Sequence, residues 1–376
     1  MLPTLIFCLL AAAYSYFLYP MLLLALPARR RSPSPQSIPA QKIAVIIAAR
    51  NEADKIAAKI DNTLALTRGS MRLDLIVASD ASDDATDSIV HSYAKHGVRL
   101  VRSPDRHGKE HAQGLAISET DADLLVFTDA GTLLASDALM HLQERFSDPS
   151  VGAVSSVDRF LTTDGSLQGE GAYVRYEMWL RDLESEYFSL VGLSGSFFAA
   201  RHEVCRKWDN RVQSDFGTAL NCVRLGLRAI SDRNLIGYYK NILDPHKEYE
   251  RKVRTVTRGM NSLIVRADVL NFRRYGRFSF EVLSHKVMRW ATPWFLLAAL
   301  AASTALAPRS TWYSCIFVLQ LAFYSLPFVS QLAPGLRRFD LTRIGIYFVE
   351  ANAAIIHATV LVLSGRSILT WEPSKR

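Results

Sequence analysis

The sequence predicts an α/β domain with a mostly parallel β-sheet, accompanied by transmembrane helices toward both ends of the chain. Two observations support this fold class. Short β-branched runs alternate with helical patterns between residues 43 and 156, and long apolar runs lie at 1–26 and beyond residue 287. Of the 376 residues, 49% are hydrophobic and 21% are charged, which excludes a disordered or fibrous chain.

The first apolar run, residues 1–26, contains no charged side chain. It is too long for the core of a cleaved signal peptide, and no basic segment precedes it, so we expect a retained transmembrane helix over residues 1–27. Arg29, Arg30 and Arg31 follow it. By the positive-inside rule, the linker at 28–42 and the domain after it then lie in the cytoplasm.

The last part of the chain contains three further apolar runs, near 287–307, 312–332 and 344–364. Each has about the 20 residues that cross a bilayer, so we expect about three transmembrane helices over 287–365. The protein is therefore expected to be integral to a plasma or inner membrane.

The orientation of the last run is left open by the charges. The basic loop with Arg337, Arg338 and Arg343 is typical of the cytoplasmic side. Four complete spans would place the basic tail, 366–376, outside, against the same rule. The last run therefore either crosses the membrane or ends within it.

The middle of the chain, residues 43–245, is predicted to be the α/β domain. Runs rich in Val, Ile and Leu predict strands at 43–49, 73–78, 98–101, 124–128 and 151–156. Apolar residues with helical spacing predict helices at 54–66, 86–96, 110–119 and 136–146. This alternation is typical of a mostly parallel sheet covered by helices on both faces.

Polar residues follow the predicted strands, where ligands bind in parallel sheets. They are Arg50, Asn51, Glu52, Asp80, Asp83, Asp84 and Asp129. No GxGxxG pattern follows the first strand, which argues against a dinucleotide-dependent oxidoreductase. Acidic strand ends suit a ribose, a base edge or a metal ion.

The formal net charge of +8 suits a protein that contacts anionic lipid or handles phosphates. The sequence contains no zinc knuckle and no aromatic RNA-binding signature, so nucleic acid is not an expected partner. The four cysteines lie far apart and indicate neither a disulfide framework nor a metal knuckle.

The motifs also resemble those of a known family. AVIIAARNEADKI, IVASDASDDATDSIV, GKEHAQGLAI and LLVFTDAGTLL resemble the successive motifs of family 2 inverting glycosyltransferases of the GT-A fold. VRYEMWLRDLESE, VGLSGSFFAARHEV, QSDFGTALNCVRLGLR and SHKVMRWATPWFLL resemble the membrane-embedded branch related to hyaluronan, chitin and poly-N-acetylglucosamine synthases. Each motif is short, and the resemblance rests on their order and spacing.

This resemblance implies a membrane-bound enzyme that transfers a sugar from a nucleotide sugar, UDP in particular, to a growing exopolysaccharide or a lipid-linked glycan. Membrane lipid would be a further partner, and the sequence does not identify whether the protein has a partner subunit. Two alternatives stay open. One is a transferase that adds a single sugar to a polyprenyl-linked acceptor, and the other is a catalytically silent GT-A scaffold.

The resemblance assigns Glu52 and Asp80 to the uracil and ribose of the donor. The family usually has two acids after the second strand, and here Ser79 replaces the first. Asp84 is either a helix cap or a ligand. Lys109 is expected to reach a phosphate, with a solvated surface lysine as the alternative.

Asp129 occupies the first position of the family's Asp-x-Asp motif, and Gly131 replaces its second acid. We expect Asp129 to bind a divalent ion, Mg²⁺ or Mn²⁺, together with the two donor phosphates, because such ions need few protein ligands. A strand-end aspartate that caps a loop is the alternative.

Asp215 matches the family's general base, which would deprotonate the acceptor hydroxyl. Capping of the following helix is the alternative role. Gly192, Ser194 and Gly195 are expected to let the acceptor approach the backbone, although a simple turn explains them almost as well.

A basic stripe follows the domain, within a segment at 246–286 that we expect to contain amphipathic interface helices. Lys247, Arg251, Arg254 and Arg258 share one helix face. The resemblance aligns Arg254 with the arginine of the processive enzymes' Gln-x-x-Arg-Trp motif. Arg251 and Thr255 replace its glutamine and tryptophan, so processive synthesis is in doubt.

The aligned arginine leads to the first prediction. If Arg254 binds the donor diphosphate, Arg254→Lys weakens nucleotide-sugar binding and slows transfer by about tenfold, because lysine lacks the planar fork that binds two phosphate oxygens. Arg258→Lys is the matched control and is expected to change neither quantity. Donor affinity and turnover of both variants in the same detergent test this, and equal effects would leave the stripe as a membrane-surface feature.

Overall fold

The computed structural model describes residues 1–28, 41–161, 171–240 and 245–365. The predicted tail and most of the predicted linker, with Arg29, Arg30 and Arg31, lie outside these ranges. The chain divides into two compact units. Among the described residues, the first contains 1–27, 245–260 and 279–365, and the second contains 28, 41–161, 171–240 and 261–278. One boundary between the units falls inside α10 (Pro245–Val265), after Met260, and another falls inside α12 (Arg277–Val282), after Phe278.

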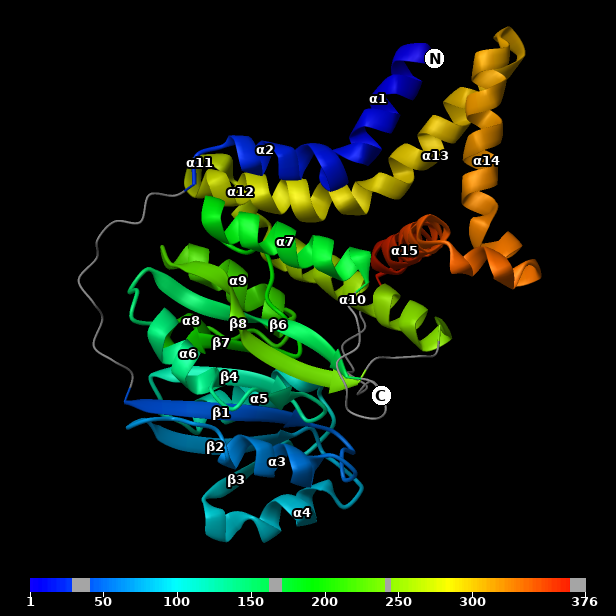
Figure 1. Ribbon diagram of the computed structural model, residues 1–376. Helices are drawn as coiled ribbons and strands as arrows, with labels where there is room; N and C mark the ends of the chain where they lie inside the picture. The colour runs from blue at the N-terminus through cyan, green and yellow to red at the C-terminus, as the bar shows by residue number, and fades with distance from the viewer. Residues whose placement is uncertain (29–40, 162–170, 241–244, 366–376) are drawn as a thin grey trace. The chain divides into compact units, whose positions relative to one another are not determined.

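The second unit is built on an eight-stranded sheet in the order β3-β2-β1-β4-β7-β6-β8-β5 (Figure 1). The strands are β1 (Lys42–Ala49), β2 (Arg72–Ser79), β3 (Val98–Arg102), β4 (Leu124–Asp129), β5 (Leu133–Leu134), β6 (Val151–Leu161), β7 (Phe197–Arg201) and β8 (Arg228–Lys240). Strands β3, β2, β1 and β4 are parallel, while β7 pairs antiparallel with β4 and β6. All five predicted strands are present, and β5, β7 and β8 are additions.

The helices of the second unit also agree with the predicted pattern. The four that were predicted are α3 (Ile56–Leu64), α4 (Thr86–Ser92), α5 (Lys109–Ser118) and α6 (Ala138–Arg145). The others are α7 (Ala172–Tyr187), α8 (His202–Cys205), α9 (Ser214–Arg224) and α11 (Phe272–Tyr275). The predicted α/β fold class with a mostly parallel sheet is therefore confirmed.

Both faces of the sheet are covered by helices around β1, which is apolar from Ile43 to Ala49. Alternate residues of β1 point to opposite faces. Ile43, Val45 and Ile47 pack in a core with residues of α3, α4 and α6. Ala44 and Ile46 pack in a second core with residues of α5, α8 and α9. Two buried faces explain why β1 lacks the polar alternation of a half-exposed strand.

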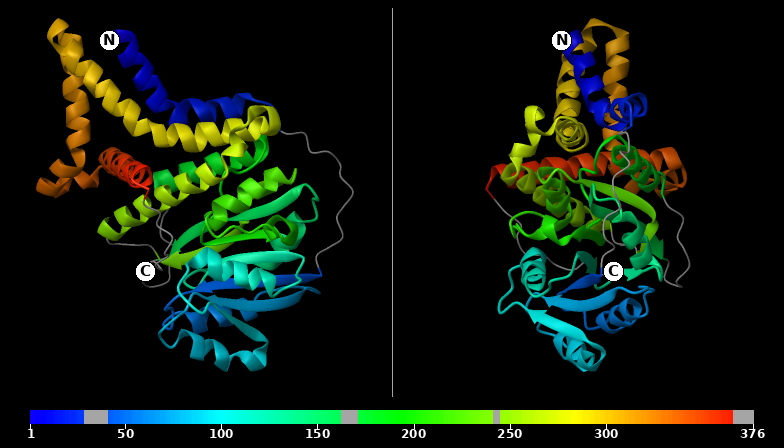
Figure 2. Two further views of the ribbon diagram at one scale, coloured as in Figure 1. Left: turned by 180° about the vertical axis from the view of Figure 1, so that it is seen from behind. Right: turned by 90° about the vertical axis from the view of Figure 1, so that its left-hand side faces the viewer.

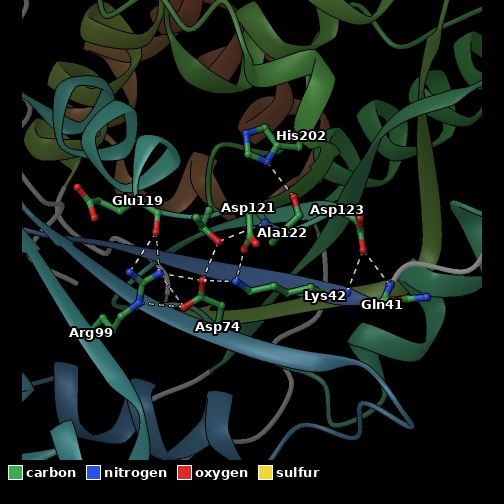
Figure 3. A network of polar contacts seen from close by, with 10 residues as sticks. Gln41, Lys42, Asp74, Arg99, Glu119, Asp121, Ala122, Asp123 and His202 are labelled. Atoms are coloured by element: carbon green, nitrogen blue, oxygen red, sulfur yellow. Dashed lines mark hydrogen bonds and ion pairs between the residues drawn. The ribbon is translucent and has the colours of Figure 1, made fainter.

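A polar network connects the amino ends of the parallel strands (Figure 3). Arg99 of β3 pairs with Asp74 of β2 at 2.8 Å, and Lys42 of β1 lies 3.6 Å from the same carboxylate. The Asp123 carboxylate, just before β4, accepts hydrogen bonds from the backbone of Gln41 and Lys42 at 2.9 and 3.0 Å. These contacts hold β3, β2, β1 and β4 together at the edge opposite to their carboxyl ends.

The first unit contains helices that are long and apolar enough to cross a membrane. They cover Leu2–Ala25, Arg277–Arg309, Thr311–Leu332 and Asp340–Leu363. The first consists of α1 (Leu2–Ala13), a π-helical turn (Tyr14–Leu18) and α2 (Tyr19–Ala25). The second combines α12 (Arg277–Val282), another π-helical turn (Leu283–Val287) and α13 (Met288–Leu306), so it begins well before the predicted residue 287.

Side chains inside the first unit explain how its helices pack. Leu5 and Cys8 of α1 lie in one apolar cluster with Ala299 and Leu306 of α13, and Figure 2 shows these helices side by side. The two π-helical turns are joined by the Tyr14 hydroxyl and Ser284 Oγ, 2.9 Å apart. A polar pair of this kind is stable among apolar helices because each hydroxyl satisfies the other.

The other two long helices are α14 (Thr311–Leu332) and α15 (Asp340–Leu363). Val253 of α10 packs against Ala354 and Ala358 of α15. Lys252 Nζ lies 3.8 Å from the ring centre of Tyr347. Part of the apolar side of α10, with Tyr249, Val253 and Val256, is therefore covered by α15 of the same unit.

Candidate active site

The predicted site residues of the α/β unit gather at the carboxyl ends of its parallel strands. Ala49 of β1 is in register with Ser79 of β2, and Ala48 of β1 is in register with Asp129 of β4. The segment after β1, Asp80 after β2 and Asp129 therefore emerge at one edge of the sheet, as the sequence predicted.

Two turns at this edge are held in an unusual backbone conformation. Asn51 and Ala81 have φ values of 54° and 53°, which side chains other than glycine seldom adopt. Asn51 and Asp83 compensate through reciprocal hydrogen bonds of 2.6 and 3.0 Å, and Arg50 pairs with Asp83 at 2.9 Å. Strain that is maintained by such contacts is common at functional sites.

Glu52 lies behind these turns and is buried. Its backbone amide donates to Thr86 Oγ1 at 2.8 Å, and its carboxylate pairs with Lys55 Nζ at 3.0 Å. Burial raises the pKa of the Glu52 carboxyl, and the Lys55 ammonium opposes this shift. Its predicted contact with the nucleotide stays a prediction.

Asp80 is only 1% exposed and faces the loop that leads into α5. Its carboxylate accepts hydrogen bonds from the backbone amides of His107 at 2.9 Å and Gly108 at 3.0 Å. Gly108 has a φ of 97°, a conformation that favours glycine. Asp80 therefore positions the start of α5, and with it the next residue, Lys109.

Lys109 connects the carboxyl end of β4 with the loop before β7. Its Nζ lies 2.5 Å from Asp129 Oδ1 and donates to the Gly195 carbonyl oxygen at 2.9 Å. The Lys109 side chain is 8% exposed, so it is not the solvated surface lysine that was the alternative. An ammonium in this position can bind phosphate oxygens as a point charge.

Among the described residues, Asp129 is the acid that stands beside Lys109 at this edge of the sheet. Its Oδ1 pairs with Lys109, while its Oδ2 has no hydrogen-bond partner among the described residues. No group of three or more His, Cys, Asp or Glu side chains within the described ranges could hold a metal ion. An ion at Asp129 would therefore take most of its ligands from phosphates and water, which suits Mg²⁺.

The residues around Ser79 and Asp84 have mainly structural contacts. Asp84 accepts from the Thr86 amide at 2.9 Å and from the Ala53 amide at 3.2 Å, which supports the helix-cap interpretation. Ser79 Oγ donates to Asp87 Oδ1 at 2.6 Å. Asp87 of α4 thus brings a carboxylate to the place where the family has its first acid, which the sequence did not reveal.

Asp215 is the second residue of α9, close to the loop before β7. A Cβ atom added to Gly195 would lie 3.0 Å from Asp215 Oδ2, so only glycine allows this approach without a shift. Gln213 Nε2 donates to the same oxygen at 3.3 Å. The Gly195 carbonyl binds Lys109, and so Asp129, Lys109 and Asp215 surround one loop.

The loop before β7 is held by a residue that the sequence analysis missed, Asp158 of β6. The hydroxyls of Ser194 and Ser196 donate to its carboxylate at 2.8 and 2.7 Å. The Ser196 carbonyl accepts from the Asp129 amide at 3.1 Å. An acid at the end of an apolar run could have drawn attention to Asp158, but the predicted strand ended at residue 156.

A second missed residue is Lys59, which lies under the turn after Asp129. It is fully buried on α3, and its Nζ donates to the Thr132 carbonyl oxygen at 2.5 Å. Burial lowers its pKa to about 7, against the opposing influence of Asp129. The sequence signal is its place on the apolar side of the helix beside Ile56 and Ile60.

Arg254 belongs to α10 in the other unit, and its contact with a diphosphate stays a prediction. In the same helix, Arg251 pairs with Glu248 at 2.7 Å. Part of the predicted basic stripe is therefore engaged within its own helix.

Part of the chain matches a known family of proteins. Residues 44–208 match the model of the family "Glycosyl transferase family 2". A poly-beta-1,6-N-acetyl-D-glucosamine synthase of Staphylococcus aureus (strain MSSA476) is 27% identical over 136 residues, which are 36% of this chain and 32% of that protein. An N-acetylglucosaminyltransferase of Rhizobium leguminosarum bv. trifolii is 35% identical over 85 residues, 22% of this chain and 47% of that protein. The chain thus spans less than half the length of these curated relatives.

A solved structure resembles almost the whole chain. The mannosyltransferase PcManGT from Pyrobaculum calidifontis, in complex with GDP-Man and Mn²⁺, aligns with a TM-score of 0.74 and 22% identity, over 97% of this chain and 99% of that one. At this identity the likeness shows the fold. The α/β unit therefore has the GT-A fold, and residues 44–208 belong to glycosyl transferase family 2.

Lys59 makes the stability of the protein depend on pH. In the folded chain its pKa is about 7, against 10.5 in the unfolded chain, so between these values the unfolded state binds a proton that the folded state lacks. Stability therefore rises with pH across this window. We expect Lys59→Met to raise the melting temperature by about 5 °C or more below pH 7, and the gain to shrink toward pH 10.

Thermal unfolding in detergent at several pH values tests this prediction. The control is Ile60→Met, which changes a residue of similar volume on the same helix and adds no titrating group. Its melting temperature should differ from that of the wild type by the same amount at every pH. A pH-independent effect of Lys59→Met would contradict the assignment.

Proposed function

We propose that the protein is a membrane-bound inverting glycosyltransferase that transfers a sugar from a UDP sugar to a growing exopolysaccharide or a lipid-linked glycan. The observation that carries this proposal is the arrangement of Asp129, Lys109 and Asp215 around the Gly195 loop. It combines a site for a diphosphate with a carboxylate that can accept a proton. The membrane-spanning nature and the cytoplasmic side of the catalytic unit are part of the proposal, supported by the four long apolar helices.

The donor would lie across the carboxyl ends of β2, β1 and β4. Asp80 and Glu52 would contact the ribose and uracil, and Lys109 would contact the diphosphate. Arg254 is assigned to the diphosphate on the sequence resemblance alone. The relatives' names favour N-acetylglucosamine as the sugar to test first.

Asp129 would hold a divalent ion with the two phosphates. When bound, such an ion neutralises the charge that develops on the leaving diphosphate. Lys109, paired with Asp129 in this structure, supplies positive charge to the same place. The residues present therefore fit a bound ion, with one protein carboxylate as its ligand.

Asp215 would act as the base. Its carboxylate accepts the proton of the acceptor hydroxyl while that oxygen bonds to the anomeric carbon, and the bond from this carbon to the diphosphate breaks. Because attack and departure occur on opposite faces, the configuration inverts. Gly192, Ser194 and Gly195 would line the approach of the acceptor, and the Cβ-free Gly195 keeps the space before Asp215 open.

A second candidate is the addition of a single sugar to a polyprenyl-linked acceptor. Thr255 favours it, because it stands where the processive enzymes have the tryptophan that stacks on the acceptor sugar. The silent-scaffold alternative gains support from Ser79 and Gly131, but a scaffold would not need the close pair of Lys109 and the half-buried Asp129.

The base assignment predicts the effect of one substitution. Asp215→Asn keeps the shape of the side chain but cannot accept the proton, so turnover should fall by about 10²- to 10⁴-fold or more while donor binding changes little. Release of nucleotide by the purified protein, measured with a panel of UDP sugars and GDP-mannose, tests this. Asp137→Asn, at an exposed position of the same unit, is the control, and wild-type turnover in Asp215→Asn would exclude Asp215 as the base.

The single acid at the metal position gives another prediction. Activity should require Mg²⁺ or Mn²⁺ and be lost in excess chelator, because the ion has to be held by Asp129 and the donor phosphates. Restoring either ion should restore turnover. Full activity in chelator would show that Lys109 alone neutralises the leaving group.

A further inference from the structure

Asp158 has a half-buried carboxylate, and among the described residues its hydrogen bonds all come from hydroxyl groups. Ser194 Oγ lies 2.8 Å from Asp158 Oδ1 and 3.0 Å from Oδ2, and Ser196 Oγ lies 2.7 Å from Oδ1. Within the described ranges, no Lys, Arg or His side chain pairs with it. Two other acids of the site differ, because the buried Glu52 pairs with Lys55 and the half-buried Asp129 pairs with Lys109.

The Asp158 carboxylate can accept more hydrogen bonds than it receives. A carboxylate has about four lone-pair positions, and each serine hydroxyl has a single proton to give. The two hydroxyl oxygens are also 2.9 Å apart, so one proton can be shared between them. At most two donated protons therefore reach Asp158, and its remaining capacity suits a ligand rich in hydroxyl groups.

The order of the strands shows which part of a donor would lie near Asp158. Asp80 follows β2 and Asp129 ends β4, and the sheet continues from β4 through β7 to β6, which carries Asp158. Neighbouring strands are about 4.8 Å apart, so β6 lies roughly 10 Å beyond β4 on the side away from Asp80. A nucleotide bound at Asp80 with its diphosphate at Asp129 would extend its sugar in this direction.

The local contacts connect this position to the reacting groups. The Ser196 carbonyl accepts from the Asp129 amide at 3.1 Å, and the Gly195 carbonyl accepts from Lys109 at 2.9 Å. Gly195 also adjoins Asp215. The hydroxyl-bound carboxylate therefore lies on the same loop as the residues assigned to the diphosphate and to the base.

We propose that Asp158, oriented by Ser194 and Ser196, binds hydroxyl groups of the sugar that is transferred and so contributes to the choice of donor. This inference rests on the proposed function. The ligand class is a nucleotide sugar with neighbouring free hydroxyls, each donating a hydrogen bond to the carboxylate. Charge-assisted bonds of this kind are stronger than neutral ones, and a site built for a hydroxyl discriminates strongly against ligands that lack it.

A comparison of nucleotide and nucleotide-sugar affinities tests the inference. The full chain in detergent is titrated calorimetrically with UDP, UDP-N-acetylglucosamine, UDP-glucose, GDP and GDP-mannose. For Asp158→Asn we expect the affinity for the best-bound nucleotide sugar to fall about tenfold or more, and the affinity for the matching diphosphate to change less than about twofold. The ratio of these affinities separates two roles of Asp158. Loss of sugar recognition would weaken binding of the nucleotide sugar alone, whereas loss of support for the loop would weaken binding of both ligands.

Two further variants complete the experiment. The double variant Ser194→Ala/Ser196→Ala releases the carboxylate without removing it, and it should show a smaller loss confined to the sugar. Ser156→Ala is the matched control, because Ser156 Oγ of β6 donates a hydrogen bond at 2.7 Å to the Phe197 carbonyl of β7. This variant should change neither the affinity for the nucleotide sugar nor that for the diphosphate.

The outcomes are distinct. Equal losses for the sugar-linked and sugar-free nucleotides in Asp158→Asn, or no loss for either, would overturn the role of Asp158 and leave the proposed function intact. A wild-type protein that binds none of the five ligands would overturn the proposed function, and the sugar site with it. If Asp158→Asn does not fold, the double serine variant decides by the same ratio.

Discussion

The register of three parallel strands is the constraint on which the site depends. Because β2, β1 and β4 are parallel, their carboxyl ends meet at one edge of the sheet. Asp80 and Asp129 lie at this edge because they stand at the carboxyl ends of β2 and β4. The network around Asp74 at the opposite edge holds the amino ends together with charge-assisted bonds (Figure 3). A slip of one residue would turn every strand side chain to the other face, so the two apolar cores also enforce this register.

Electrostatic compensation explains how so many acids can stand at one edge. Asp80 is satisfied by two backbone amides, Glu52 by Lys55 and Asp129 by Lys109. The departures from the family pattern at Ser79 and Gly131 fit this arrangement. Asp87 brings a carboxylate to Ser79, and a single acid remains at Asp129 beside a lysine. In the proposed donor site, a diphosphate would therefore meet more positive charge than a pair of acids would leave.

The first unit contains polar groups that lie among apolar helices and pair with one another. The hydroxyls of Tyr14 and Ser284 satisfy each other where α1 and the helix containing α13 are interrupted by π-helical turns. Such turns interrupt regular helices often at functional positions. The amphipathic helix α10 covers its apolar side with Ala354 and Ala358 of α15. Of its basic residues, Arg251 pairs with Glu248 in the same helix, and Lys252 lies against the ring of Tyr347 in α15.

Local periodicity by itself determined the α/β class, the five core strands, the four helices between them and the long apolar helices. It did so because burial on both faces, helical spacing and membrane length each leave a pattern within a few neighbouring residues. The acids at the strand ends could be predicted for the same reason. Only the tertiary structure decided which of these groups meet. Lys109 reaches Asp129 and Gly195, and Asp158 reaches Ser194, because strands and loops distant in sequence become neighbours in the order β4-β7-β6. Burial of Lys59 beneath the turn after Asp129 likewise follows from helix packing. No local sequence pattern specifies that its ammonium group donates a hydrogen bond to the Thr132 carbonyl.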